Sequence, residues 1–259
     1  MYTTKDYKYL LIEKHQGIVV MSLNRPAKLN AINIDMSNEI HSALNQISSD
    51  KDCSVLVITG SGRGFCSGWD FSGDNSDEQN IDSYNITNIG QHIVQMPQPV
   101  IAAVNGIAAG IGLSIAMSAD VRIAAKSAQF SCIFVKRSLV PDGGASLMLQ
   151  QLLGKGIAME MSLTGNIYDS DWALDKGLVN KLTQNTLLLE SALEVGFTIA
   201  NNPPAAVRAI KRIMNTTESL LSGVIESENE ANNLLLKTDD FQESILSFKE
   251  KRPPAYRDT

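Results

Sequence analysis

Apolar positions along the chain change repeatedly between the spacing of strands and the spacing of helices. Apolar runs that suit strands occur at residues 9–13, 17–24, 54–59, 100–105, 120–125 and 177–183. Apolar residues three or four positions apart predict helices over residues 34–47, 84–95, 110–119, 145–153 and again after residue 154. The run over residues 54–59 is apolar at consecutive positions, which predicts a central strand covered on both faces. Strands that alternate with helices in this way predict an α/β fold.

The last quarter of the chain has a different pattern. Residues 186–250 show helical spacing only, and the pair Pro203–Pro204 marks the start of one helix. We therefore divide the chain into an α/β core over residues 1–200 and a helical C-terminal region over residues 201–259. Residues 72–83 are polar and have almost nothing to bury, which predicts a mobile loop.

Composition limits the class of protein. Of 259 residues, 44% are hydrophobic and 19% are charged, so the chain can bury a substantial core. A net charge of -6 gives no electrostatic reason to expect nucleic acid or a membrane surface as a partner. Cys53, Cys66 and Cys132 are too few and too scattered for a disulfide framework or a metal site, so we expect them to be buried and reduced. The first residues lack the apolar run of a signal peptide, and the longest apolar stretch, residues 100–119, is interrupted by asparagine and glycine. We therefore expect a soluble, cytoplasmic protein.

Two junctions between a strand and a helix are rich in glycine. The first covers residues 58–70 (ITGSGRGFCSGWD) and the second covers residues 99–113 (PVIAAVNGIAAGIGL). Such a turn at a helix start presents backbone N–H groups toward a ligand. One turn of this kind is a weak signal, but two, each following a buried strand, can converge on one oxygen atom.

With these junctions the sequence resembles the crotonase (enoyl-CoA hydratase/isomerase) superfamily over nearly its whole length. The motifs that carry the resemblance follow the family order: NRPAKLNA at residues 24–31, FCSGWD at 65–70, VNGIAAGIG at 104–112, VPDGG at 140–144, LTG at 163–165, ALDKGLV at 173–179 and FKEKR at 248–252. The resemblance implies a crotonase-like ββα spiral with two roughly perpendicular sheets. It also implies that the C-terminal helices assemble a homotrimer or a dimer of trimers.

The resemblance further implies the ligand and its site. The substrate would be an acyl-CoA thioester, with no other cofactor and no metal. Its carbonyl oxygen would be held by the backbone N–H groups of Trp69 and Ile111, which would stabilise an enolate. Lys28 would bind the CoA phosphates, and the acyl pocket would be shaped by Phe134 and the 72–83 loop. Residues expected around the substrate are Lys28, Ala31, Cys66, Gly68, Asp70, Phe71, Gly110, Ser114, Phe134 and, across a subunit interface, Phe248 and Lys251.

The acidic residues decide which reaction to expect. Hydration of an enoyl thioester needs two acid/base groups, which are two glutamates in the hydratases of the family. This sequence has Ser114 and Phe134 at the corresponding positions. One acidic residue, Asp142, remains at a motif where some isomerases of the superfamily, such as the epoxyphenylacetyl-CoA isomerases, carry a catalytic aspartate. Because isomerisation needs a single base that removes a proton and returns it, we predict an isomerase with Asp142 as its base.

Several alternatives stay open at this point. Asp142 can instead be the N-cap of the helix that begins near Gly143. Ser114 can be a nucleophile, although a serine at a helix start is more often structural. Dehalogenases of the superfamily use an aspartate at this place as a nucleophile, but they add a histidine where this chain has Thr87 and a tryptophan where it has Phe134. The remaining candidates are a divergent hydratase, a thioester hydrolase, and a non-catalytic acyl-CoA-binding scaffold.

Overall fold

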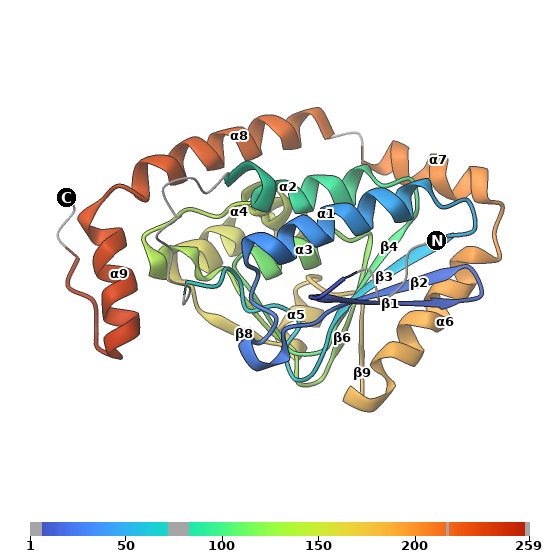
Figure 1. Cartoon of the computed structure of the whole chain (residues 1–259), viewed down its shortest axis with the longest axis horizontal. Coiled ribbons are helices and arrows are strands. Elements are labelled where there is room, and N and C mark those ends of the chain that lie inside the picture. The colour runs from blue at the N-terminus through green and yellow to red at the C-terminus, as the bar shows by residue number, and fades with distance from the viewer. Residues whose placement is uncertain (1–6, 72–82, 216–217, 257–259) are drawn as a thin grey trace.

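The computed structural model describes residues 7–71, 83–215 and 218–256, whose strands form two sheets (Figure 1). The larger sheet contains, side by side in this order, β1 (Leu10–His15), β2 (Ile18–Leu23), β3 (Val55–Gly60), β4 (Val100–Val104), β6 (Val121–Ala125) and β9 (Lys181–Thr183). The smaller sheet contains β5 (Ile107–Ala109), β7 (Gln129–Ser131) and β8 (Ile167–Asp169). The pairs β1–β2 and β7–β8 are antiparallel, and the other pairs are parallel.

Helices cover the larger sheet and extend beyond it. They are α1 (Ile34–Ser49), α2 (Ser83–Gln95), α3 (Ile111–Ser118), α4 (Ala145–Thr164), α5 (Ser170–Asp175), α6 (Leu188–Ala200), α7 (Pro204–Met214), α8 (Glu218–Leu235) and α9 (Asp239–Glu250). Short 3₁₀ helices are η2 (Pro26–Lys28), η4 (Ile133–Arg137) and η5 (Asn185–Leu187). Figure 1 shows α8 running above α2 and leading to α9, so that α9 lies at the opposite end of the molecule from α7.

Alternate residues of β3 are buried on opposite faces of the sheet. Leu56 and Ile58 join the main apolar core, to which α1 also contributes, whereas Val55 and Val57 join a second cluster that includes residues of α6. Apolar residues at consecutive positions are needed only where both faces of a strand are covered. The predicted central strand is therefore confirmed.

Most of the predicted elements are present with ends shifted by a few residues. Of the strand expected over residues 177–183, only Lys181–Thr183 forms a strand, β9. The helix expected after Gly154 is the second part of α4, which is interrupted at Gly154 by a non-helical φ of 74°. The expectation for residues 72–82 falls outside the described residues. The division at residue 200 stays a prediction, although α7 packs on the core: Lys211 Nζ is buried and donates to the carbonyl oxygens of Ile93 and Gln98.

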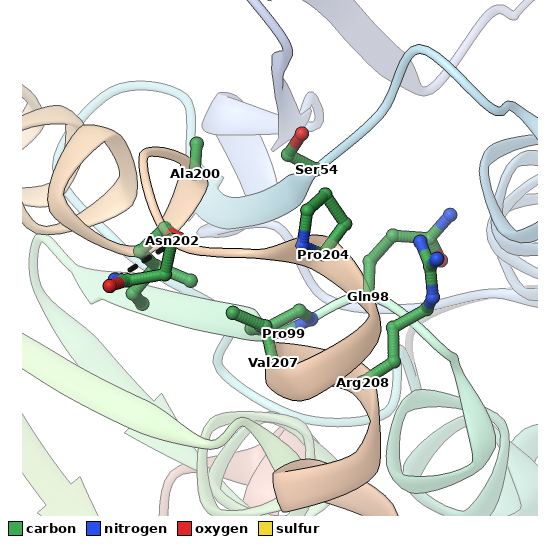
Figure 2. Close-up of a pocket in the computed structure, with 9 residues that line it drawn as sticks. Ser54, Gln98, Pro99, Ala200, Asn202, Pro204, Val207 and Arg208 are labelled. Carbon is green, nitrogen blue, oxygen red and sulfur yellow. Dashed lines mark hydrogen bonds between the residues drawn. The ribbon is translucent and has the colours of Figure 1, made fainter.

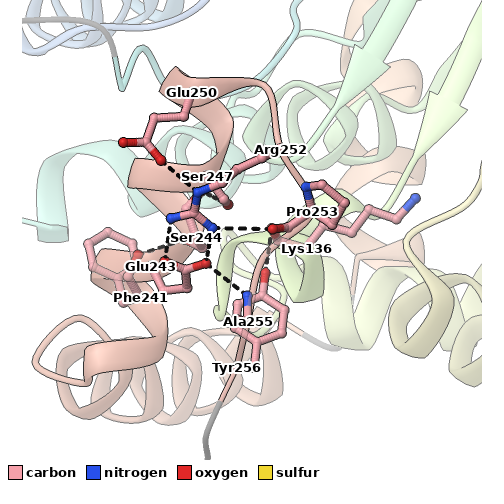
Figure 3. Close-up of polar contacts among 10 residues, drawn as sticks. All are labelled: Lys136, Phe241, Glu243, Ser244, Ser247, Glu250, Arg252, Pro253, Ala255 and Tyr256. Atoms are coloured by element: carbon pink, nitrogen blue, oxygen red, sulfur yellow. Dashed lines mark hydrogen bonds and ion pairs between the residues drawn. The ribbon is translucent and has the colours of Figure 1, made fainter.

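The segment after α9 folds back onto η4. Arg252 binds the carboxylate of Glu243, with 2.8 Å between Nη2 and Oε2, and the N–H of Ala255 donates to the same carboxylate (Figure 3). The hydroxyl of Tyr256 then donates to the carbonyl oxygen of Lys136 in η4 at 3.3 Å. These contacts attach the end of the chain to the segment that carries Phe134.

The three cysteines are free and buried, as expected. Burial raises the pKa of the Cys66 thiol to about 12, so this thiol stays protonated and unreactive at physiological pH. Among the described residues, no helix combines the length and the apolar composition needed to cross a bilayer.

Candidate active site

The two glycine-rich turns lie in contact with each other. Gly68 in the first turn has a φ of 112° and Gly110 in the second has a φ of 54°. A Cβ atom added to Gly68 would lie 3.2 Å from the carbonyl oxygen of Ala109, and one added to Gly110 would lie 3.7 Å from the Cα of Gly68. Glycine is therefore favoured at both positions by backbone conformation, and at Gly68 also by close approach. The two turns therefore touch, and their convergence on one oxygen atom stays a prediction.

The backbone N–H groups of Trp69 in the first turn and Ile111 in the second have no hydrogen-bond partner among the described residues. Ile32 pairs with Trp69 in a parallel bridge. The bridge uses the carbonyl of Gly68 and the N–H of Asp70, so the N–H of Trp69 points the other way. Ile111 is the first residue of α3, where an N–H group has no acceptor within the helix. Two such donors on touching turns, one of them at a helix N-terminus, suit a developing oxyanion.

α3 lies directly against the first turn. The N–H of Cys66 donates to the carbonyl oxygen of Ile107 at 3.0 Å, and the carbonyl oxygen of Cys66 accepts from the N–H of Ala109 at 3.0 Å. A Cβ atom added to Gly112 in α3 would lie only 2.2 Å from that same carbonyl oxygen. The distance between the two N–H donors is therefore set by a helix that touches the backbone of the first turn.

Asp142 is tied to the same helix. Ser114, one turn after Ile111, donates its hydroxyl to the carbonyl oxygen of Asp142 at 2.8 Å. The Asp142 residue is half-buried, but its Oδ1 is enclosed and has no hydrogen-bond partner among the described residues. Burial, and after it the negative charge of Glu228, raise the pKa of Asp142 to about 8. A carboxyl group with an unpartnered oxygen and a pKa near neutrality suits a base that accepts a proton and returns it.

Two of the alternative roles are not what the structure shows. Gly144, not Asp142, is the N-cap of α4 and has no side-chain cap bond, while the N–H groups of Gly144 and Ser146 donate to Glu228. The interpretation of Asp142 as a helix cap is therefore wrong. The hydroxyl of Ser114 is buried and donates to a backbone carbonyl, which favours the structural role for this serine.

Comparison with known proteins decides the family. Residues 13–259 match the family model described as Enoyl-CoA hydratase/isomerase. The chain belongs to the enoyl-CoA hydratase/isomerase family. It is 30% identical to a 1,2-epoxyphenylacetyl-CoA isomerase of Escherichia coli, over 96% of this chain and 98% of that protein. It is 32% identical to a short-chain-enoyl-CoA hydratase of Clostridium acetobutylicum, over 94% of this chain and 95% of that protein.

Solved structures of enoyl-CoA hydratase/isomerase family members have the same fold. An enoyl-CoA hydratase from Mycobacterium avium subsp. paratuberculosis superposes with a TM-score of 0.88 at 30% identity, covering 97% of this chain and 99% of that one. An enoyl-CoA hydratase/isomerase from Pseudoalteromonas atlantica superposes with a TM-score of 0.89 at 27% identity, covering 96% of this chain and 100% of that one. The crotonase-like fold expected from the sequence is confirmed.

The N-terminal motif of this family member supports the first glycine-rich turn. Asn30 is buried, donates its amide to the carbonyl oxygen of Gly64 at 2.8 Å and accepts from the N–H of Arg25 at 2.8 Å. Arg25 in turn pairs with Asp70, with 2.8 Å between Nη2 and Oδ2. Arg25 and Asn30 were not among the predicted site residues. Polar residues inside a family motif were the available signal, but their roles depend on contacts with a segment more than 30 positions away.

The predicted acyl-pocket residues cluster only in part. Phe134 is buried, and a Cβ atom added to Gly110 would lie 4.0 Å from its ring. Phe71 meets the ring of Phe241 in α9 with 6.3 Å between the ring centroids. Ala31 and Cys66 are buried. Their roles toward a substrate stay predictions.

The predicted CoA contacts lie at the surface. Lys28 is exposed at the end of η2 and Lys251 is exposed just after α9. Phe248 is 57% exposed and lies against Arg137 of η4 in the same chain, with 4.3 Å between the guanidinium carbon and the ring centroid. Whether these residues bind CoA stays a prediction.

His92 of α2 contacts a second histidine, His41. Its Nδ1 lies 3.1 Å from Nδ1 of His41 in α1, and the two rings are stacked. Burial, and then the neighbouring His41, lower the pKa of His92. Within the described ranges no three residues of the types His, Cys, Asp and Glu gather as a metal site would require.

Two cavities of this family member lie away from Asp142, Trp69 and Ile111. A groove of about 710 Å³ is lined by α4, α7 and the end of α3, and its lining includes neither Asp142 nor the two oxyanion turns. A second crevice, where Pro204 and Val207 of α7 face Gln98 and Pro99 (Figure 2), has a volume of about 10 Å³. That volume is about the space of one water molecule. The two touching turns and the Asp142 carboxyl group are therefore the better guide to the active site.

Proposed function

We propose that the protein is an enoyl-CoA isomerase, which moves a carbon–carbon double bond in an acyl-CoA thioester. The observation that carries the proposal is the position of Asp142. The backbone carbonyl oxygen of Asp142 is held by Ser114 of the helix whose first N–H group belongs to Ile111, and the side-chain Oδ1 of Asp142 has no partner among the described residues. This arrangement supplies one base and one oxyanion site, which is what isomerisation requires.

The reaction then takes two proton transfers. The carboxylate of Asp142 removes a proton from the α carbon of a β,γ-unsaturated thioester, and the electron pair moves onto the carbonyl oxygen to form a dienolate. The N–H groups of Trp69 and Ile111 stabilise that oxygen, each contributing about 3 kcal/mol in comparable acyl-transfer sites. The protonated Asp142 returns the proton to the γ carbon, which leaves the α,β-unsaturated thioester. The only coenzyme involved is the CoA of the substrate itself.

The side chains around Asp142 favour isomerisation over hydration. Hydration needs a second acid or base, but the hydroxyl of Ser114 is used by a backbone carbonyl and Phe134 is apolar. The other buried acid near Asp142, Glu228, accepts hydrogen bonds with both carboxylate oxygens. The identities to the isomerase and hydratase relatives, 30% and 32%, are too similar to separate the two reactions. The chemistry of the site is therefore the stronger criterion.

The proposal is tested by incubating the purified protein with a β,γ-unsaturated acyl-CoA in deuterated water and following the products by mass spectrometry. We expect the α,β-unsaturated isomer. Any deuterium in the product should be at the α or γ carbon, where protons are removed and returned. A product heavier by one water would show a hydratase, and release of free CoA would show a thioester hydrolase. Binding of the thioester without turnover would show a non-catalytic binder, and each of these three results would refute the proposal.

We also propose that the protein assembles as a homotrimer or a dimer of trimers. Large apolar side chains are exposed on α4, β8 and α7, among them Leu163, Ile167 and Met214, which are 65%, 57% and 77% exposed and would be buried favourably between copies of the chain. Light scattering after gel filtration should give a mass of three or six times the 28.1 kDa of the chain. A monomeric mass at micromolar concentration would contradict this proposal.

A further inference from the structure

The inward face of α8 carries a buried carboxylate beside the proposed base. Glu228 is 5% exposed and Asn232, one turn later, is 8% exposed. Burying an ionisable side chain is costly unless it is hydrogen-bonded. Glu228 and Asn232 therefore need specific partners, and both find them in the loop that contains Asp142.

The two side chains hold that loop on both sides of Asp142. Glu228 accepts from the N–H of Gly144 at 2.8 Å and from the N–H of Ser146 at 2.9 Å. Asn232 accepts from the N–H of Val140 at 2.9 Å and donates to the carbonyl oxygen of Val140 at 3.2 Å. The loop residue between these contacts, Asp142, is itself held through its carbonyl oxygen by Ser114. Its backbone is thus fixed from α3 and α8, while its Oδ1 has no partner in the part of the chain that the structure describes.

We propose that Glu228 is a positioning residue for the reaction: it fixes the backbone after Asp142 and places a second negative charge next to the carboxyl group that transfers the proton. The inference rests on the proposed isomerase function. The first effect needs only the hydrogen bonds of Glu228, whereas the second needs its charge. A carboxylate at the N-terminus of α4 is also stabilised by the unpaired N–H groups and the dipole of that helix. This explains how a charge is kept at a buried position.

The ionisable groups near this pair support the assignment. Burial raises the pKa of Glu228, and the hydrogen bonds from Ser146 and Gly144 oppose that rise. Cys132, between β7 and η4, interacts electrostatically with both acids: burial, and then the two carboxylates, raise its pKa to about 11 against the opposing hydrogen bond with Ser162. This thiol is neutral at physiological pH, so it does not offset the charge of Glu228. None of the described groups that shift the pKa of Asp142 is cationic.

The test compares Glu228→Gln, Glu228→Asp and Asn232→Ala. Glu228→Gln removes the charge and keeps one acceptor oxygen, so the pH at half-maximal isomerase activity should fall from near 8 by about one unit. Glu228→Asp keeps the charge and should restore the wild-type pH profile at a reduced kcat. Asn232→Ala loosens the other side of the loop, so kcat should fall while the pH profile stays in place. A pH profile that is the same in all three variants would show a purely structural role and overturn the proposal.

A second readout does not depend on turnover. The carboxyl group of Asp142 can be titrated by NMR in protein labelled with ¹³C at the aspartate side-chain carboxyl, with Asp142→Asn identifying its signal. The midpoint should move to lower pH in Glu228→Gln and remain in place in Asn232→Ala. A shifted midpoint in a protein without isomerase activity would refute the proposed function alone, whereas an unshifted midpoint would refute the role of Glu228. If Glu228→Gln folds poorly, Glu228→Ala also removes the charge, and the Asp142 midpoint should move in the same direction in that variant.

Discussion

Replacing Asp142 with asparagine should abolish double-bond isomerisation while leaving acyl-CoA binding intact. An amide cannot accept and return a proton at neutral pH, and general base catalysis contributes about 10²- to 10⁴-fold to such reactions. We therefore expect kcat to fall by about 10³-fold, with the dissociation constant of a saturated acyl-CoA unchanged. The measurements are the deuterium exchange assay and isothermal titration calorimetry.

The pH dependence of the wild-type enzyme belongs to the same prediction. Because burial raises the pKa of Asp142 to about 8, most of the base is protonated at pH 7, and activity should rise with pH through that value. Asp175→Asn is the matched control, since it makes the same chemical change at an exposed ion pair with Lys176. The control should keep the wild-type rate and pH profile. Isomerase turnover at the wild-type rate in Asp142→Asn would remove Asp142 from the mechanism.

Asp142→Asn should also be more stable than the wild type at neutral and mildly alkaline pH. The unfolded chain releases the Asp142 proton near pH 3.8, but the folded protein holds it until about pH 8. Between these values the folded state binds more protons, so the contribution of this group to the free energy of unfolding falls as pH rises. Asparagine does not titrate, so the Tm advantage of Asp142→Asn should be larger at pH 8 than at pH 5. An advantage that does not change with pH would mean that the pKa of Asp142 is not raised.

Much of the fold could be predicted from the sequence because its main elements are long and strongly patterned. The consecutive apolar residues of β3 and the helical spacing in α1 are local signals, and the structure contains both. The family resemblance implied a second sheet, but its strands were not located from the residue pattern because β5, β7 and β8 have three residues each. Three residues are too few to show alternation, and such strands exist only because their partners are brought alongside.

Some features of the candidate site could be predicted from the sequence, and others could not. The two glycine-rich turns were predictable because Gly68 and Gly110 mark backbone conformations that are unfavourable for other residues. Glu228 was not predictable, since a glutamate among the polar residues of α8 looks like part of a solvent-exposed face. Its contact with Gly144 joins residues 84 positions apart, and only the packing of α8 onto α4 creates it. The helix-cap interpretation of Asp142 failed for the same reason, because the carboxylate that supplies the cap comes from a distant helix.

Gly112→Ala should damage both stability and the oxyanion site. The added methyl group would lie 2.2 Å from the carbonyl oxygen of Cys66 and 2.8 Å from its Cβ atom. That carbonyl oxygen is fixed by a hydrogen bond from Ala109, so no flexible side-chain end can move aside. α3 must therefore shift away from the first turn, and Ile111 shifts with it relative to Trp69. Overpacking against backbone should cost about 3 kcal/mol of stability.

Loss of one oxyanion donor lowers kcat by about 10²- to 10³-fold in comparable sites, so a similar loss is expected in Gly112→Ala. The matched control is Gly223→Ala in α8, where an added Cβ atom meets nothing within 4 Å. Alanine is favoured over glycine in a helix by about 1 kcal/mol, so this control should melt at or above the wild-type temperature with full activity. Thermal unfolding and initial rates, measured on both variants at a temperature where each is folded, separate the two effects. If Gly112→Ala loses stability but keeps the wild-type kcat, the contact of α3 with Cys66 supports the fold without setting the geometry of the oxyanion donors.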